Sequence, residues 1–448
     1  MSHSLSDLSQ NLLRAAKAAG ADAADVLAVD GRSISVDVLG GKLEHAESAE
    51  GVEVGLRVLV GQKQACVSSS LIDAATLQNM AERAVFMAKE APEDPYIGLA
   101  DPDQLTSSAD ADGLDLFDPS DAPQPADLEE DARQAEAAAL AIEGISQVQS
   151  ASGAHGNRRI HLATSNGFEG GYQRSSRSIS CVAITGEGTG MERDYFGESR
   201  IYQSDLPSPA DVGRIAAERT LARAGARKPK TGAYPVIFEE RVASSLIGHL
   251  LSAANGAMIA RGSSWLKDKM GAQVLPNGLD IIEDPHRPRV SGSRPFDGEG
   301  LPTAARHIVQ DGVLQSWTLD LANARKLDMP STANASRGTS SPPSPAVSNV
   351  ALTQGDQTLD EMLKDMGTGL LVTSMIGSTI NPNTGDYSRG ASGFWIENGE
   401  RAYAVNECTL AGNLLDMLMT LRPANDARPH LSRIVPSLAV EGLVLAGE

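Results

Sequence analysis

Apolar residues recur at intervals of three and four residues over the segment 240–262, which is the spacing of one face of an α-helix. They are Val242, Leu246, Leu250, Ala253 and Ala257. A second row at the same spacing is small or polar, and it consists of Ser245, His249, Ser252 and Gly256. The pattern predicts a single amphipathic helix over residues 240–262, which another segment can approach closely along its small residues.

The same reasoning predicts helices and antiparallel strands in the N-terminal half. Apolar residues at helical spacing predict helices over residues 5–19, 73–91, 127–143 and 209–224. Alternating runs predict strands over residues 24–29, 33–39, 52–60 and 178–185. Turn-forming dipeptides between such runs predict turns at residues 30–31, 40–41, 156–157 and 166–167. Residues 92–126 are rich in Asp, Pro, Ser and Ala, which indicates an acidic surface loop.

The C-terminal half is rich in Gly, Asn and Ser and in short alternating runs. Asp311-Gly312 predicts one hairpin, residues 390–405 a second, and residues 413–421 a short helix. The basic segment 227–232 is typical of a domain boundary. We therefore expect an α+β protein of two domains.

The first expected domain, residues 1–230, consists of helices and antiparallel strands and includes the acidic loop 92–126. The second, residues 231–448, is rich in antiparallel β-sheet and carries the helix 240–262.

The net charge of −20 over 448 residues limits the possible partners. Nucleic-acid binding depends on clustered Lys and Arg, and the sequence shows no such cluster, so we expect no nucleic-acid partner. The three cysteines, Cys66, Cys181 and Cys408, are far apart and form no CxxC pair, as in a reducing compartment. The N-terminus lacks the pattern of a signal peptide, and no stretch reaches membrane-spanning length. We expect a soluble cytoplasmic protein without a membrane partner.

His249 has three interpretations from the sequence alone. It is a satisfied histidine at the edge of the core, or the base of a Ser245–His249 nucleophilic pair, or one ligand of a metal site. The second interpretation lacks a strained turn at Ser245 and a carboxylate to orient the imidazole. The third needs two or three further ligands, and the helix offers none.

Four blocks of sequence are spread over the C-terminal half. The longest, residues 381–399, reads NPNTGDYSRGASGFWIENG, and the others are residues 296–302, 332–338 and 409–413. In their order and separation these blocks resemble the TldD/PmbA family, whose members are described as modulators of DNA gyrase and as metallopeptidases.

This resemblance implies two kinds of subunit. The TldD-like subunit carries an HExxxH zinc motif on the helix that corresponds to residues 240–262, with a cysteine near the C-terminus as third ligand. The PmbA-like subunit, also called TldE, pairs with it and lacks these ligands. In this sequence the three motif positions are Ser244, Ser245 and His249, so the motif is degenerate. Residues 425–447 contain no cysteine, and Cys408 precedes the block 409–413, where the ligand is not expected.

The resemblance therefore predicts a non-catalytic PmbA/TldE-like subunit of a cytoplasmic heterodimeric zinc metalloprotease that degrades or processes unfolded peptides. We expect no metal and no cofactor in this chain, zinc in the TldD-like partner subunit, and an unfolded peptide as substrate. Within this block, residues 386–393 predict a Gly-, Ser- and Asn-rich hairpin with accessible backbone groups, suited to binding a peptide as an added strand. The alternative is that this hairpin is only a structural turn. Its candidate cleft residues are Asp386, Tyr387, Ser388, Arg389, Gly390 and Ser392.

Two other functions stay open at this point. One is a stand-alone protein that binds a peptide or a protein without any protease subunit. The other is a hydrolase that uses Asp297 and Glu299 with His307. Against the hydrolase, carboxylates such as Asp297 and Glu299 more often form a turn or lie on the surface.

Overall fold

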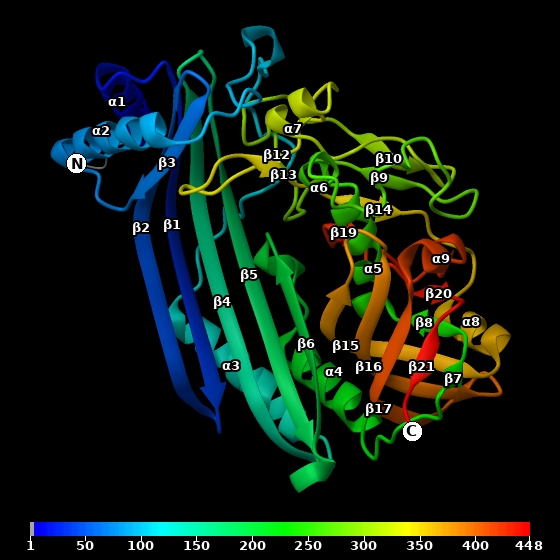
Figure 1. Ribbon diagram of the computed structural model, residues 1–448. Coiled ribbons are helices and arrows are strands. Elements are labelled where there is room, and N and C mark those ends of the chain that lie inside the picture. Colours follow the sequence, from blue (N-terminus) through cyan, green and yellow to red (C-terminus); the bar gives the residue numbers. More distant parts are fainter. Residues whose placement is uncertain (1–3) are drawn as a thin grey trace.

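The structure is a computed structural model that describes residues 4–448, apart from the side chain of Ser378. Its two halves lie side by side, with a sheet of long strands on the left of Figure 1 and the β-rich C-terminal half on the right. Helices and mainly antiparallel sheets are both abundant, which confirms the predicted α+β class. None of the helices in the described range 4–448 combines the length and the apolar character needed to cross a membrane.

The N-terminal sheet is antiparallel throughout, with strand order β3-β2-β1-β4-β5-β6. Its strands are β1 (Ala23–Leu39), β2 (Lys42–Val60), β3 (Lys63–Ser69), β4 (Ile145–Thr164), β5 (Glu169–Thr185) and β6 (Glu192–Arg200). Val26 and Ile34 both occupy even positions of β1, so their side chains leave the sheet on the same face. Val26 packs in a core cluster with residues of α1 (Leu5–Ala18) and α2 (Ala74–Glu90), and Ile34 with residues of α3 (Pro125–Leu140) and α4 (Pro209–Ala222).

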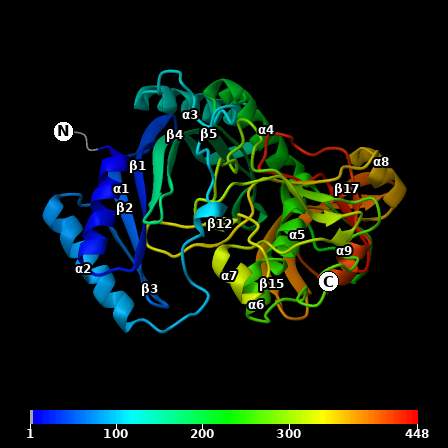
Figure 2. The same ribbon diagram turned by 90° about the horizontal axis from the view of Figure 1, so that it is seen from above.

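All four helices therefore cover one face, and the opposite face turns toward the C-terminal half (Figure 2). The four predicted helices are confirmed to within three residues at each end.

Two of the predicted turns are wrong. β1 runs straight through Asp30-Gly31, and β4 runs straight through Gly156-Asn157. Each of these segments has strand partners on both sides, so the paired ladder outweighs the local turn preference of Gly and Asn. The turns at residues 40–41 and 166–167 are confirmed.

The C-terminal half contains an eight-stranded sheet with the order β18-β20-β8-β15-β16-β17-β21-β7. Its long central strands are β15 (Gly369–Ile380), β16 (Asp386–Glu397) and β17 (Glu400–Asn413). The short strands are β7 (Gly232–Ala233), β8 (Val236–Phe238), β18 (Arg422–Pro423), β20 (Leu438–Val440) and β21 (Val444–Ala446). A helix, α8 (Leu359–Met366), precedes β15, and another, α9 (Leu414–Met419), follows β17 near the predicted helix 413–421.

A smaller sheet lies above this one in Figure 1 and has the order β11-β10-β9-β14-β19. Its strands are β9 (Ile281–Glu283), β10 (Arg306–Gln310), β11 (Val313–Leu314), β14 (Val350–Leu352) and β19 (Arg433–Ile434). β10 and β11 form the predicted hairpin around Asp311-Gly312. The short helix α7 (Leu321–Lys326) follows this sheet's hairpin in the chain.

The predicted helix 240–262 is two helices. α5 (Glu240–Ala253) ends before Asn255, whose side chain accepts a hydrogen bond from the N–H of Ala257 and begins α6 (Gly256–Ala260). The N–H of Gly256 donates to the carbonyl of Thr318 at 2.9 Å. A Cβ at Gly256 would lie 2.5 Å from the Leu319 side chain, so a glycine is required at this contact. A long-range contact therefore interrupts the helix that the local pattern predicts.

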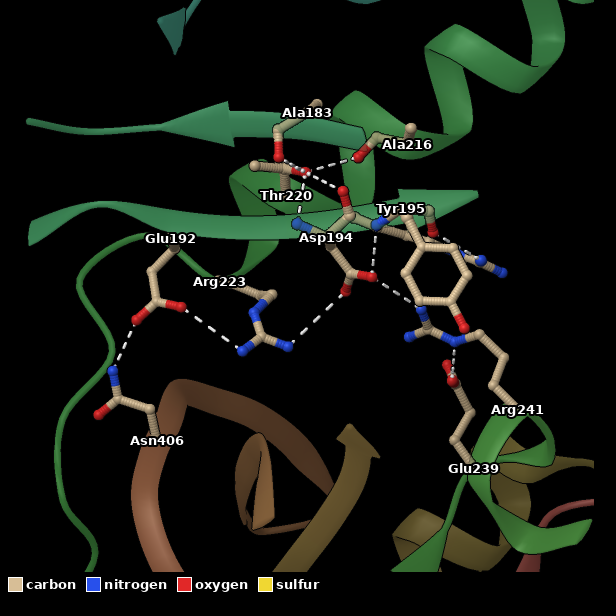
Figure 3. A network of polar contacts seen from close by, with 11 residues as sticks. Ala183, Glu192, Asp194, Tyr195, Ala216, Thr220, Arg223, Glu239, Arg241 and Asn406 are labelled. Atoms are coloured by element: carbon tan, nitrogen blue, oxygen red, sulfur yellow. Dashed lines mark hydrogen bonds and ion pairs between the residues drawn. The ribbon is translucent and has the colours of Figure 1, made fainter. Parts of the chain in front are cut away.

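A polar network ties the start of α5 to the N-terminal half (Figure 3). Asp194 on β6 accepts a hydrogen bond from Arg241 of α5 at 3.1 Å and lies 3.8 Å from Arg223, the residue that follows α4. Glu192 pairs with Arg223 at 3.5 Å and accepts a hydrogen bond from Asn406 of β17 at 2.6 Å. These contacts fix α5 relative to both sheets.

A second contact between the two halves of the chain is formed by one buried carboxylate. Asp25 on β1 pairs with Arg57 on β2 at 2.5 Å and also with Arg337, and all three side chains are at most 4% exposed. Arg337 belongs to the loop that carries β12 (Ala335–Ser336) and β13 (Ser344–Pro345), drawn in yellow as it crosses to the N-terminal sheet in Figures 1 and 2. Next to it, Gly55 touches the backbone of Thr339 so closely that any side chain would collide.

Replacing Asp25 with Asn should lower the free energy of unfolding by about 3 to 5 kcal/mol, because two buried guanidinium groups would lose their counter-charge. Burial raises the pKa of Asp25, but Arg337 and Arg57 together lower it below the ordinary value. Its stabilising effect is therefore present above about pH 4 and is lost as the pH falls through the lowered pKa. Chemical denaturation of both proteins across pH 3 to 7 measures the difference.

The matched control is Asp30→Asn on the same strand, which breaks an ion pair with Arg159 that is half-exposed. We expect a loss of about 1 kcal/mol or less there. Equal losses in the two variants would contradict the role given to Asp25.

Candidate functional site

The three motif positions lie on α5, a regular α-helix. The hydroxyl of Ser245 donates a hydrogen bond to the carbonyl of Val242 at 2.7 Å. It therefore bonds within its own helix, and no hydrogen bond joins it to His249 among residues 4–448. Positions 244 and 249 lie about 140° apart around an ideal helix, so they do not share one face. The hydrogen bond of Ser245 within its own helix argues against the Ser–His nucleophilic pair, and the angle between positions 244 and 249 argues against a shared metal site on this regular helix.

His249 is a partly buried, neutral imidazole. Its ring packs edge-on against Tyr387 of β16, with the ring centroids 6.0 Å apart. Its Nε2 atom is buried and has no hydrogen-bond partner in the described range. Burial, and secondarily the positive charge of Arg389, lowers the pKa of His249 to about 4. The imidazole is therefore uncharged at neutral pH and packs as an aromatic group.

The residues around His249 do not fit a zinc ion. Among residues 4–448, no group of three or more His, Cys, Asp or Glu side chains is arranged to hold a metal ion. Cys408 is buried, and its thiol donates to the carbonyl of Ala391 at 3.2 Å. Burial raises the pKa of this thiol to about 11, whereas a zinc ligand must be a thiolate. A catalytic zinc needs three protein ligands and an open position, and α5 supplies one imidazole.

The candidate cleft residues lie on β16, which is a central strand. β16 pairs with β15 on one side and with β17 on the other over almost its whole length. The expectation that its backbone groups are accessible for an added strand is therefore wrong. The predicted hairpin 386–393 lies within this single strand, and its local pattern could not show that β15 pairs along the edge opposite to β17.

The side chains of β16 differ in exposure. Tyr387 is 2% exposed and packs in the core, so it cannot line a cleft. Asp386 is exposed and accepts hydrogen bonds from Thr384 and Asn413. Four positions are half-buried, namely Ser388, Arg389, Gly390 and Ser392.

The alternative site at Asp297, Glu299 and His307 is not assembled. Asp297 is buried and accepts hydrogen bonds from the backbone N–H groups of Glu299, Leu301 and Ala335, which is the arrangement of a turn. Burial and the neighbouring Asp297 raise the pKa of Glu299 to about 8. His307 lies on β10 opposite Ile282, and no hydrogen bond joins it to either carboxylate in the described part of the chain.

Sequence reasoning missed a groove of about 1390 Å³ between the two halves. Its floor is the helix-free face of β1, β2, β4, β5 and β6, and its wall includes Arg289, Arg428 and His430 from the C-terminal half. The groove was missed because the long strands were predicted as short ones with turns at residues 30–31 and 156–157. The cross-strand register, which brings small side chains together on the floor, is not visible in a single strand.

Comparison with family models gives three matches that together cover most of the chain. They are the PmbA/TldA metallopeptidase domain 1 over residues 24–88, its central domain over residues 118–224, and its C-terminal domain over residues 231–447. The chain belongs to the PmbA/TldD family. The metalloprotease PmbA of Escherichia coli O157:H7 is 36% identical over 428 residues, covering 94% of this chain and 92% of that protein.

Other family members agree in sequence and in fold. The metalloprotease PmbA homolog of Haemophilus influenzae is 37% identical over 446 residues, covering 97% of this chain and 94% of its own length. A proposed modulator of DNA gyrase from Bacteroides thetaiotaomicron has a solved structure with a TM-score of 0.91 at 29% identity, covering 99% of both chains. TldE of Thermococcus kodakarensis has the same fold, with a TM-score of 0.84 at 19% identity over 98% of this chain and 99% of that one.

Restoring two motif positions should not create a peptidase. The double substitution Ser244→His and Ser245→Glu adds one ligand and a base, but the third ligand is still missing. We expect weak zinc binding at most and no cleavage of an unstructured peptide. The measurement is peptidase activity with and without a chelator.

The control is the same double variant with His249→Ala added, which should behave identically. Robust cleavage that the chelator stops and that His249→Ala removes would show that a third ligand exists.

Proposed function

We propose that this chain is the non-catalytic, PmbA/TldE-like subunit of a cytoplasmic heterodimeric zinc metalloprotease that degrades or processes unfolded peptides. The observation that carries the proposal is the composition of α5, which has serines at two motif positions and a single neutral imidazole at the third. A catalytic zinc site cannot be built on one such donor. In this proposal the zinc and the catalytic base belong to a TldD-like, HExxxH-bearing partner subunit.

Two further features support a role in a shared peptide cleft. Relatives that match nearly the full length of this chain are metalloproteases by name, and in this proposal the chain keeps the family's fold without the zinc chemistry. The buried ties at Asp25 and Asp194 hold its two halves in one arrangement. A rigid body with a wide groove suits a subunit that shapes a cleft and positions an extended peptide there. Ser388, Arg389, Gly390 and Ser392 lie outside this groove and are our candidates to line the cleft that is shared with the partner subunit.

The test is reconstitution with the HExxxH-bearing relative from the same source. Mixed at micromolar concentration, the two chains should elute as one heterodimer in size-exclusion chromatography with light scattering. The interface should bury well over the standard size of about 1,600 Å². Cleavage of an unstructured peptide should appear in the mixture and be weak or absent for either chain alone.

Matched variants separate the contributions of the two chains. His249→Ala in this chain should leave the zinc content and the activity of the mixture unchanged, whereas Ala at the HExxxH glutamate of the relative should abolish cleavage. If the two chains elute separately and the relative is fully active alone, the proposal is wrong and a stand-alone binding protein takes its place.

A further inference from the structure

Two arginines face each other across the floor of the groove. Arg158 on β4 is directly opposite Arg174 on β5, and both line the groove. Side chains directly opposite on antiparallel strands are close neighbours, and like charges in such positions destabilise the sheet. Burial lowers the pKa of Arg174, Tyr172 opposes this as the next largest effect, and the positive charges of Arg158 and Arg294 lower the pKa further. The protein therefore maintains a local excess of positive charge at this point.

No carboxylate of the described range 4–448 pairs with either arginine. Arg174 donates one hydrogen bond to the carbonyl of Ser293 at 2.5 Å and lies against the ring of Tyr172. Arg158 is exposed and has no hydrogen-bond or ion-pair partner within residues 4–448. Its chain neighbour Arg159, in contrast, pairs with Asp30. An arginine pair without counter-charge is what a binding site for an anionic group requires.

The two rows of the floor beside the two arginines consist of small residues. In line with Arg158 lie Gly31 of β1 and Gly51 of β2, and a Cβ at Gly51 would meet nothing within 4 Å. The next row across the strands is Ala49, Ser33, Gly156 and Ser176. All of these residues line the groove. An extended chain can lie on such a floor and still bring an acidic side chain to the arginines.

The rim of the groove favours a peptide over a nucleic acid as the occupant. Residues 42–53 of β2 pair with β1 only, because β3 covers β2 from Val54 onward. This leaves backbone N–H and C=O groups at the rim that can bind an extended peptide. Glu47 and Glu198 also line the groove, and the chain carries a net charge of −20. Negative groups at several points disfavour a continuous phosphate backbone but tolerate a peptide with carboxylates at one position.

We propose that this groove binds extended peptide segments rich in Asp or Glu, with Arg158 and Arg174 holding a carboxylate. The inference rests on the proposed function only for the origin of the peptide, since the binding site lies wholly within this chain. It implies that the subunit selects acidic segments and presents them, while cleavage takes place elsewhere.

The test uses the full-length isolated chain and a fluorescently labelled 12-residue Gly/Ser peptide that carries four Glu residues in its centre. Fluorescence anisotropy at low salt should show saturable binding, and peptides with Gln or Lys in place of Glu should bind at least about tenfold more weakly. Added salt should weaken binding of the Glu peptide. Arg158→Gln should weaken it by about tenfold, and Arg158→Glu should reverse the preference toward the Lys peptide.

Arg159→Gln is the matched control, because successive residues of a strand point to opposite faces. It should leave the affinity unchanged. Thermal denaturation separates binding from a structural role, since Arg158→Gln relieves like-charge repulsion and should leave the melting temperature unchanged or higher. A marked fall in the melting temperature would show that Arg158 is structural.

Three results would overturn the inference, namely equal affinity for the Glu and Gln peptides, equal effects of Arg158→Gln and Arg159→Gln, and a single-stranded oligonucleotide that displaces the Glu peptide at lower concentration. None of them bears on the proposed function, which the reconstituted mixture tests separately. A heterodimer with peptidase activity but no acidic preference would retain the proposed function and reject this inference.

Discussion

The buried carboxylate of Asp25 pairs with two guanidinium groups that come from opposite halves of the chain. Arg57 is its neighbour on the N-terminal sheet, and Arg337 reaches it on the loop from the C-terminal half. A charge so deeply buried is stable only when it is fully paired, so this contact fixes where the loop meets the sheet. The groove has its floor on one half and its wall on the other, and its shape depends on this contact and on the network around Asp194.

Much of the fold could be predicted from local patterns, because helices and short hairpins depend on residues near one another. The four N-terminal helices and the hairpin at Asp311-Gly312 are of this kind. Two of the wrong predictions involve partners outside the local segment. The turn expected at Asp30-Gly31 is prevented by pairing with β2 and β4, and the helix 240–262 is interrupted where Gly256 meets Thr318.

For the candidate site too, residue identities could be read from the sequence, whereas properties that depend on contacts between elements could not. The loss of a zinc ligand at Ser244 and of the base at Ser245 is a matter of residue identity, and it could be read from the motif that the family resemblance supplied. Whether His249 is neutral depends on its burial against Tyr387, and whether β16 is accessible depends on β15 and β17. Arg158 and Arg174 are 16 positions apart, and only the register of β4 against β5 makes them neighbours. No local pattern marks either of them.

The structure thus shows a helix with a single neutral imidazole at the motif positions and, apart from it, a groove with two arginines that pair with no carboxylate of residues 4–448. In the proposed function, this chain contributes shape, charge and a rigid frame, and the metal chemistry belongs to another subunit. The most direct test is the zinc content of the purified full-length chain, measured by elemental analysis after dialysis against metal-free buffer. The account predicts well below one zinc ion per chain, with no change in His249→Ala. Near-stoichiometric zinc that is lost in His249→Ala would contradict it.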